Sequence, residues 1–314
     1  MDTGAIRQWL RPWWRIARNA VQLWLDNQAF SHAAALAFYT LFSLAPVVII
    51  AVSIIGIVLG EQAAQGEIVG QLADVMGHQA AAAVEQAVAR SRIETSGLLP
   101  TVLGFGALLV GATTVFAQMQ SALNAIWNVT ARPDRSSLWS LVKTRLLSLA
   151  VVLAIGFVLL VSLLLGVMLR AFFQFADQFL PAVATLLSAV ELTVSLVVVA
   201  LLFATIFKVL PDVVLRWRDV MVGAAVTAVL FSVGRYGIAA YLAYTATAST
   251  YGAAGSVVLI LLWVYYSSLI LMLGAAFTRT HLQERGGSVW PRNGAVRVHQ
   301  AVLVDELGSP HVAR

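Results

Sequence analysis

The chain has 314 residues, of which 60% are hydrophobic and only 11% are charged. A soluble domain carries about 25% charged residues, so this composition excludes an ordinary soluble protein and indicates a polytopic membrane protein. There is no cysteine, which excludes disulfides and thiolate metal sites, and the net charge of +5 suggests contact with anionic lipid before nucleic acid.

Residues 5–26 predict an amphipathic helix that lies on the membrane surface. The basic residues of this segment fall within about one quadrant of a helical wheel, with tryptophan and aliphatic residues opposite. These basic residues are Arg7, Arg11, Arg15 and Arg18. Simple anchoring is favoured over a specific binding role, with the arginines contacting anionic lipid.

The first membrane-spanning helix is predicted at about residues 31–59, because no Asp, Glu, Lys or Arg occurs between Asp26 and Glu61. A proline and several polar residues follow one side of this helix, namely His32, Tyr39, Ser43 and Pro46. Pro46 cannot donate a backbone hydrogen bond to Phe42, which predicts a kink. Two interpretations of this stripe stay open: a buried packing face, which is favoured, and the wall of a polar cavity.

The remaining pattern predicts an all-α bundle of six transmembrane helices in a single domain, residues 1–280. Residues 61–97 are polar and acidic and predict short helices outside the membrane. Further spans are predicted at about 98–127, 146–169, 182–207, 220–243 and 256–277. The segment 281–314 is polar, contains glycine and proline, and predicts a disordered tail.

The distribution of lysine and arginine predicts the orientation. Sixteen of these residues fall at the N-terminus, in the loops after the second and fourth spans, and in the tail, whereas three fall on the opposite side. By the positive-inside rule, both termini are expected in the cytoplasm.

Two ionisable residues, Glu191 and Arg235, are predicted at nearly equal depth inside the fourth and fifth spans. A charge at a helix centre costs about 2.5–3.5 kcal/mol on insertion scales, so we expect a compensating environment. Glu191 shares a face with Ser188 and Ser195, and Arg235 follows Ser232. We predict an ion pair inside the bundle, with a structural role slightly favoured over a substrate or proton site.

Four segments, in this order, resemble the BrkB/YihY-like family of bacterial inner-membrane proteins. They are AAALAFYTLFSLAPVVIIAVSIIG (33–56), LNAIWNV (123–129), VLPDVVLRWRDVMVGAAVTAVLFSVGR (209–235) and YGAAGSVVLILLWVYYSSLILMLGAAFTR (251–279). The resemblance implies a six-span inner-membrane protein of undefined activity; some relatives are linked to virulence, and older labels called some a tRNA-processing ribonuclease. This chain lacks the acidic residues that relatives often have near Ser232 and Ala276, which places ion coupling in doubt.

The sequence offers little for catalysis. Its five histidines are scattered without a metal-binding spacing, and no phosphate-gripping GxxxxGK[ST] occurs. We therefore expect no enzyme activity, no cofactor and no metal, which makes a membrane-bound ribonuclease the least favoured function.

Two functions remain open. The first is transport or flipping of a lipid or small amphiphilic solute, suggested by the kinked first span, the buried charges and a polar lining of the sixth span. That lining comprises Tyr251, Tyr265, Tyr266 and Ser267. The second is a non-catalytic scaffold for envelope integrity or virulence. Both imply membrane lipids as partners and no nucleic acid, and the sequence does not specify an oligomeric state.

The predicted ion pair can be tested through protein levels. Removing one partner of a buried pair leaves an uncompensated charge, which costs several kcal/mol. Arg235→Ala should therefore lower the amount of folded protein in the membrane more than the double change with Glu191→Ala does. Equal losses in the single and double variants, measured by fluorescence size-exclusion chromatography, would contradict the pair.

Overall fold

The computed structural model describes residues 3–60, 98–131, 184–244, 255–292, 294–298, 301–304 and 310–313, with parts of 62–85. Its helices are α1 (Thr3–Asp26), α2 (Ala29–Leu59), α5 (Leu98–Trp127), α7 (Ala184–Val209), α8 (Trp217–Tyr244) and α10 (Gly255–Glu284). Its strands are β1 (Val129–Ala131), β2 (Val213–Val214), β3 (Trp290–Pro291), β4 (Ala295–Arg297), β5 (Ala301–Val304) and β6 (Pro310–Ala313).

The helix ends lie within three residues of the predicted ranges, except that α10 continues to Glu284. The apolar run of α10 ends near residue 277, but its last turns are held as a helix by packing against α1. The predicted span at 146–169 and most of segment 61–97 lie outside the described residues.

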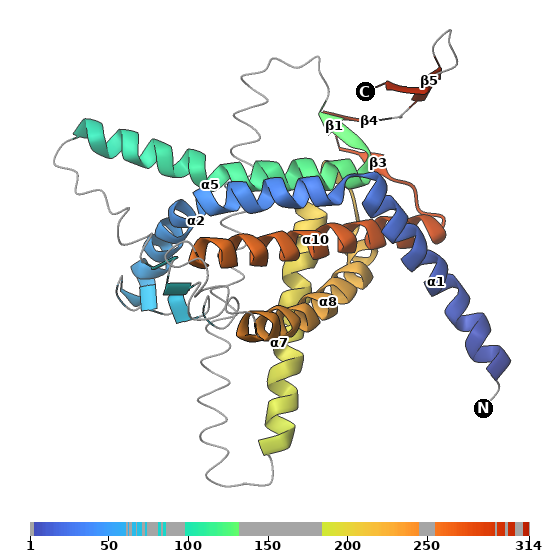
Figure 1. The fold of residues 1–314 in the computed structure, drawn as a ribbon, viewed down its shortest axis with the longest axis horizontal. Coiled ribbons are helices and arrows are strands. Elements are labelled where there is room, and N and C mark those ends of the chain that lie inside the picture. Colours follow the sequence, from blue (N-terminus) through green and yellow to red (C-terminus); the bar gives the residue numbers. More distant parts are fainter. Residues whose placement is uncertain are drawn as a thin grey trace.

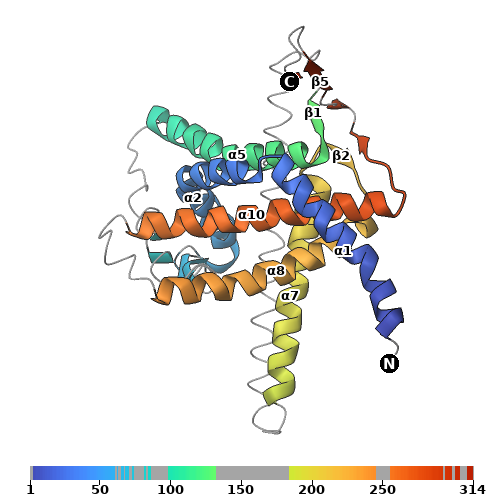
Figure 2. The same ribbon diagram turned by 45° about the vertical axis from the view of Figure 1, so that its right-hand side comes forward.

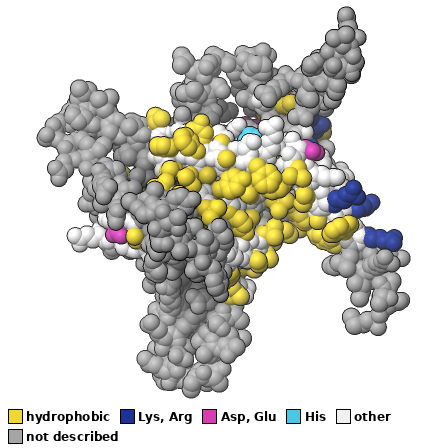
Figure 3. Space-filling model, in the orientation of Figure 1, with side chains coloured by type: hydrophobic (Ala, Val, Ile, Leu, Met, Phe, Trp, Pro, Cys, Tyr) yellow, Lys and Arg dark blue, Asp and Glu magenta, His cyan; other side chains and the backbone are white. Residues whose placement is uncertain are grey.

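Three of the described helical segments are long and apolar enough to cross a membrane: Leu192–Val209, Trp217–Gly237 and Val257–Glu284. In an 18-residue apolar window of each segment, only 22%, 28% and 39% of the residues are buried inside the protein. Figure 3 shows the resulting broad hydrophobic surface, while the Lys and Arg side chains visible on this face lie at one end. Apolar helices of this length that stay largely exposed indicate a helical membrane protein.

Helices α2, α5 and α10 run side by side, and α8 packs along α10 (Figures 1 and 2). The ribbon of α2 bends along its course in Figure 1, as an internal proline predicts. Helix α7 packs on α8 but crosses the other helices at a steep angle in both views. The described helices therefore do not all run along one direction, since α7 crosses the others.

Helices α8 and α10 meet in a close antiparallel contact built from two Gly-xxx-Thr pairs. A Cβ atom added to Gly223 would lie 1.9 Å from Oγ1 of Thr278, and one added to Gly274 would lie 1.9 Å from Oγ1 of Thr227. Each threonine hydroxyl donates to the glycine carbonyl of its own helix, at 2.6 Å for Thr227 and 2.7 Å for Thr278. Small residues thus let the two backbones approach, and both threonine hydroxyls are satisfied.

Helix α1 crosses the last turns of α10 obliquely (Figures 1 and 2). The Trp13 ring stacks on the buried His281 ring with centroids 5.5 Å apart, and His281 stacks on Phe277 at 6.2 Å. Nearer the end of α1, Trp24 Nε1 donates to the carbonyl of Leu269 at 3.2 Å. These contacts fix α1 to the bundle, in addition to any contact it makes with the membrane surface.

The described parts of the segment after α10, for which the composition predicts a disordered tail, contain four short strands. Strand β3 pairs with β2 of the α7–α8 loop, and β4 pairs with β1 at the end of α5. These two pairings join residues that are far apart in sequence, which local composition cannot reveal. Strands β5 and β6 pair with each other.

The close contact between α8 and α10 predicts that Gly274→Ala destabilises the protein. Its new Cβ would overlap the Thr227 hydroxyl, and overpacking of this kind costs about 1–3 kcal/mol. Gly237→Ala is the matched control, since no atom lies within 4 Å of its added Cβ. A thermal unfolding scan in detergent should show a lower midpoint for Gly274→Ala alone; equal midpoints would contradict the role of this contact.

Candidate functional site

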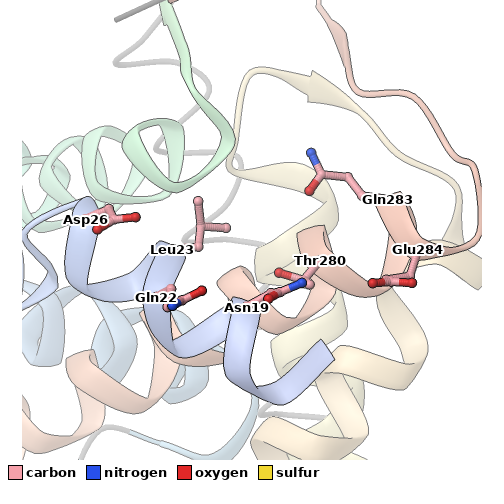
Figure 4. A pocket seen from close by; sticks show the side chains of 7 residues that line it. All are labelled: Asn19, Gln22, Leu23, Asp26, Thr280, Gln283 and Glu284. Atoms are coloured by element: carbon pink, nitrogen blue, oxygen red, sulfur yellow. The ribbon is translucent and has the colours of Figure 1, made fainter. Parts of the chain in front are cut away.

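A polar groove of about 390 Å³ lies between α1 and the end of α10. Figure 4 shows four of its lining side chains projecting from α1 and three from α10. The lining residues are Asn19, Gln22, Leu23, Asp26, Thr280, Gln283 and Glu284. Their spacing of three and four residues places each set on one face of its helix, so the groove follows directly from where α1 crosses α10.

The groove is rich in hydrogen-bond acceptors. Asp26 and Glu284 contribute carboxylates, and most of the other lining side chains are carboxamides. At the edge, Arg15 Nη2 lies 3.4 Å from Glu284 Oε2, with side chains 66% and 30% exposed, so this ion pair adds little stability. Among the described contacts, Asp26 forms no ion pair, which leaves its charge available to a ligand.

Helix α1 presents three different faces. Trp13, Ile16 and Ala20 face the protein. The apolar residues Trp14, Val21 and Leu25 are 74%, 43% and 51% exposed. The exposed polar residues include the predicted basic stripe and the acidic end of the helix, namely Arg11, Arg15, Arg18, Asn19, Gln22 and Asp26. The side chain of Arg7 lies outside the described residues.

Arg235 is half-buried in α8, inside one of the apolar segments. Its Nη2 lies 3.4 Å from the Tyr236 hydroxyl, and its guanidinium lies 5.1 Å from the centre of the Tyr236 ring. Ser232 is half-buried and Ser195 is exposed. The side chains of Glu191 and Ser188 lie outside the described residues, so the ion pair stays a prediction.

The described residues of the polar stripe on the first span differ in how much of each side chain is exposed. Ser43 is 1% exposed and donates to the Thr40 carbonyl at 3.3 Å, whereas Tyr39 is 39% exposed and His32 is half-buried. The side chain of Pro46 lies outside the described residues.

The predicted lining of the sixth span is partly described. Tyr265, Tyr266 and Ser267 are half-buried in α10, and the Tyr266 ring fills the space beside Gly234 of α8. Tyr251 lies outside the described residues. The Tyr266 side chain thus packs at the α8–α10 contact.

A polar network around Asp212 was missed by the sequence reasoning. Its carboxylate accepts from Gln120 Nε2, with the shorter contact at 3.2 Å, and from Asn124 Nδ2 at 2.8 Å. The Asp212 amide donates to Asn124 Oδ1 at 2.8 Å, and the Asp212 carbonyl accepts from the Arg292 amide at 2.8 Å. Two amide side chains four residues apart in an apolar helix were the available signal.

Arg279 makes a second connection at this end of the protein. Its Nη1 donates to the carbonyl of Ile126 in the last turn of α5, where a cation satisfies an unpaired helix carbonyl. Within the described ranges, no three His, Asp or Glu side chains come together as a metal site.

Comparison with known proteins identifies membrane-protein relatives. A family model described as Virulence factor BrkB matches residues 20–295. A UPF0761 membrane protein of Ralstonia nicotianae is 26% identical over 89% of this chain and 62% of its own length. One of Stenotrophomonas maltophilia is 28% identical over 81% of this chain and 58% of its own length.

A shorter match is closer in sequence. A UPF0761 membrane protein of Tolumonas auensis is 38% identical over 24% of this chain and 25% of its own length. The chain thus spans at most about six tenths of these relatives. No solved structure matches significantly.

The Asp212 network predicts strong coupling between its members. Asp212→Ala removes the acceptor of two partly buried amides, which should cost about 1–3 kcal/mol. Once Asn124 is already alanine, the same change should cost less, because one of the stranded donors is gone. Thermal unfolding of both single variants and the double variant measures this coupling. If the destabilisation of the double variant equals the sum of the two single variants, Asp212 and Asn124 are not energetically coupled.

Proposed function

This chain belongs to the BrkB family of membrane proteins, and we propose that it transports or flips a lipid or small amphiphilic solute across the bacterial inner membrane. In this proposal the protein is not an enzyme, uses no cofactor, binds no nucleic acid and has membrane lipids as its partners.

The observation that carries the proposal is the position of Arg235. It lies within an apolar membrane segment, where an arginine is costly and generally serves a function. Its described contacts are the hydroxyl and ring of Tyr236, neither of which neutralises the guanidinium charge. An anionic headgroup passing through the bundle would neutralise the guanidinium charge of Arg235, unless Glu191 already neutralises it.

We further propose six spans with both termini in the cytoplasm. Supporting this topology, the antiparallel contact brings the start of α8 and the end of α10 to one end of the protein. Basic residues occur at the start of α8 and at the end of α10, among them Arg216, Arg218, Arg279 and Arg285. Positive charge of this kind marks the cytoplasmic side of a bacterial membrane protein.

A non-catalytic scaffold for envelope integrity is the second candidate. It is favoured by the bonds that tie the basic end together, where Asp212, Arg279 and Arg292 join segments distant in sequence. A platform held this firmly suits docking of other envelope components.

Reconstitution separates these functions. Purified protein in liposomes should accelerate lipid exchange between leaflets, which is measured by bleaching a fluorescent lipid in the outer leaflet. Alternatively, it should release a solute trapped in the liposomes. Arg235→Gln should slow the process about tenfold or more, because it removes a charged hydrogen-bond donor. Arg235→Lys keeps the charge and should retain more activity.

Arg216→Gln, an exposed change outside the apolar segment, is the control and should match the unchanged protein. Folded protein that moves neither lipid nor solute would reject transport and favour the scaffold.

A further inference from the structure

We propose that the corner where the ends of α5 and α10 meet strand β4 binds a phosphate group, held between the guanidinium groups of Arg279 and Arg297. Such a phosphate belongs either to an anionic lipid headgroup or to a free phosphate ion. This goes beyond the proposed function, because it assigns a ligand class to a site other than Arg235 and does not depend on transport.

The fold brings the two arginines to the same corner. Near the end of α10, Arg279 Nη1 donates to the carbonyl of Ile126 in the last turn of α5. Strand β4 runs antiparallel to the residues that follow this turn, and Arg297 is the partner of Val129 there. The two guanidinium charges lie close enough to repel each other. An anion held between them would replace this repulsion by attraction.

Within the described part of the chain, no carboxylate forms an ion pair with either arginine. Their described hydrogen bonds go to backbone carbonyls, that of Ile126 for Arg279 and that of Val289 for Arg297. Asp212 is also bonded to α5, but its carboxylate accepts from two carboxamides of that helix. A carbonyl does not neutralise a guanidinium, so both positive charges remain available to an anion.

Arg279 keeps free the edge of its guanidinium that suits an oxyanion. Its Nη1 is bonded to α5, whereas its buried Nε has no hydrogen-bond partner and its Nη2 has no described bond. The N–H groups of Nε and Nη2 are parallel and match two oxygens of one phosphate. Because the side chain is half-buried rather than enclosed, an anion can reach this edge.

The same turn of α5 holds a second unsatisfied donor. Trp127 directly follows Ile126, is 1% exposed, and has a buried Nε1 without a hydrogen-bond partner. Buried donors in proteins normally have an acceptor, from the protein or from a bound molecule. Two such donors on neighbouring segments, beside two cations, favour a ligand that carries several acceptor oxygens and a negative charge, as phosphate does.

The corner lies away from Arg235 along the helices. Thr278, the residue before Arg279, packs against Gly223 near the start of α8. Arg235 lies instead at the level of Tyr266, which packs beside the preceding residue of α8. The two levels are separated by about 20 Å along α10, at about 1.5 Å per residue. The corner is thus at the basic end, and basic residues at a membrane surface attract anionic headgroups.

Binding to the purified full chain in detergent tests this site. Native mass spectrometry would compare short-chain phosphatidylglycerol, whose phosphate charge is unbalanced, with phosphatidylcholine of the same acyl chains. We expect phosphatidylglycerol to bind about tenfold tighter or more, the effect of one charged hydrogen bond. Inorganic phosphate, added at constant ionic strength, is the soluble probe. Its displacement of the lipid would show that the site accepts free phosphate, whereas retention of the lipid would identify the headgroup as the ligand.

The exposed Arg297 provides the decisive variant, because Arg279→Gln also removes a bond to α5 and can impair folding. Arg297→Gln should reduce the preference for phosphatidylglycerol about tenfold, and Arg297→Lys should retain more of it. Arg216→Gln removes the same charge from another exposed position and should leave the preference intact.

Three results would overturn the proposal. They are equal affinity for the two lipids, a preference that Arg297→Gln leaves unchanged, and a loss in Arg216→Gln as large as that in Arg297→Gln. The last result would mean general attraction to a basic surface rather than a site. Loss of transport would not bear on this proposal, since binding is measured directly.

Discussion

The close antiparallel contact of α8 and α10 is the interaction on which the rest of the described structure depends. Apolar side chains gain little by leaving lipid for each other, so helices in a membrane associate through backbone proximity and dispersion. Gly223 and Gly274 permit this approach, and the threonine opposite each glycine fills the space that remains. The contact also fixes the position of α8 along α10. Because the helices are antiparallel, the start of α8 and the end of α10 lie on the same side.

Polar chemistry is consequently concentrated at the basic end. There the α7–α8 loop reaches α5 through Asp212, and the segment after α10 returns to pair with β1 and β2. Arg279 caps the last turn of α5. Each connection satisfies groups that would be costly to leave unpaired near lipid. The helices can therefore remain largely exposed to lipid along their length while one end is tied by directional bonds.

Two polar features lie outside these connections at the basic end. Arg235 lies in an apolar segment with only a tyrosine as its described partner, and the groove beside α1 holds a carboxylate without a described cation. Along α10, the residues that contact α1 and line the groove lie beyond Tyr266, which packs at the level of Gly234. The two features therefore occupy different depths. The transport proposed for this chain would use polar side chains at both the surface and the interior of the membrane.

The sequence by itself determined that this is a membrane protein and, except for the end of α10, where the described helices begin and end, since apolar length and the absence of charge act locally. Its motifs also predicted membership of the BrkB family, which the family model confirms. Only the tertiary structure decided the steep crossing of α7, the groove and the strand pairs of the C-terminal segment. Asp212 with Asn124, and Arg15 with Glu284, are 88 and 269 residues apart. Such pairs form because packing brings distant faces together, and a helical period contains no information about the partner a face will meet.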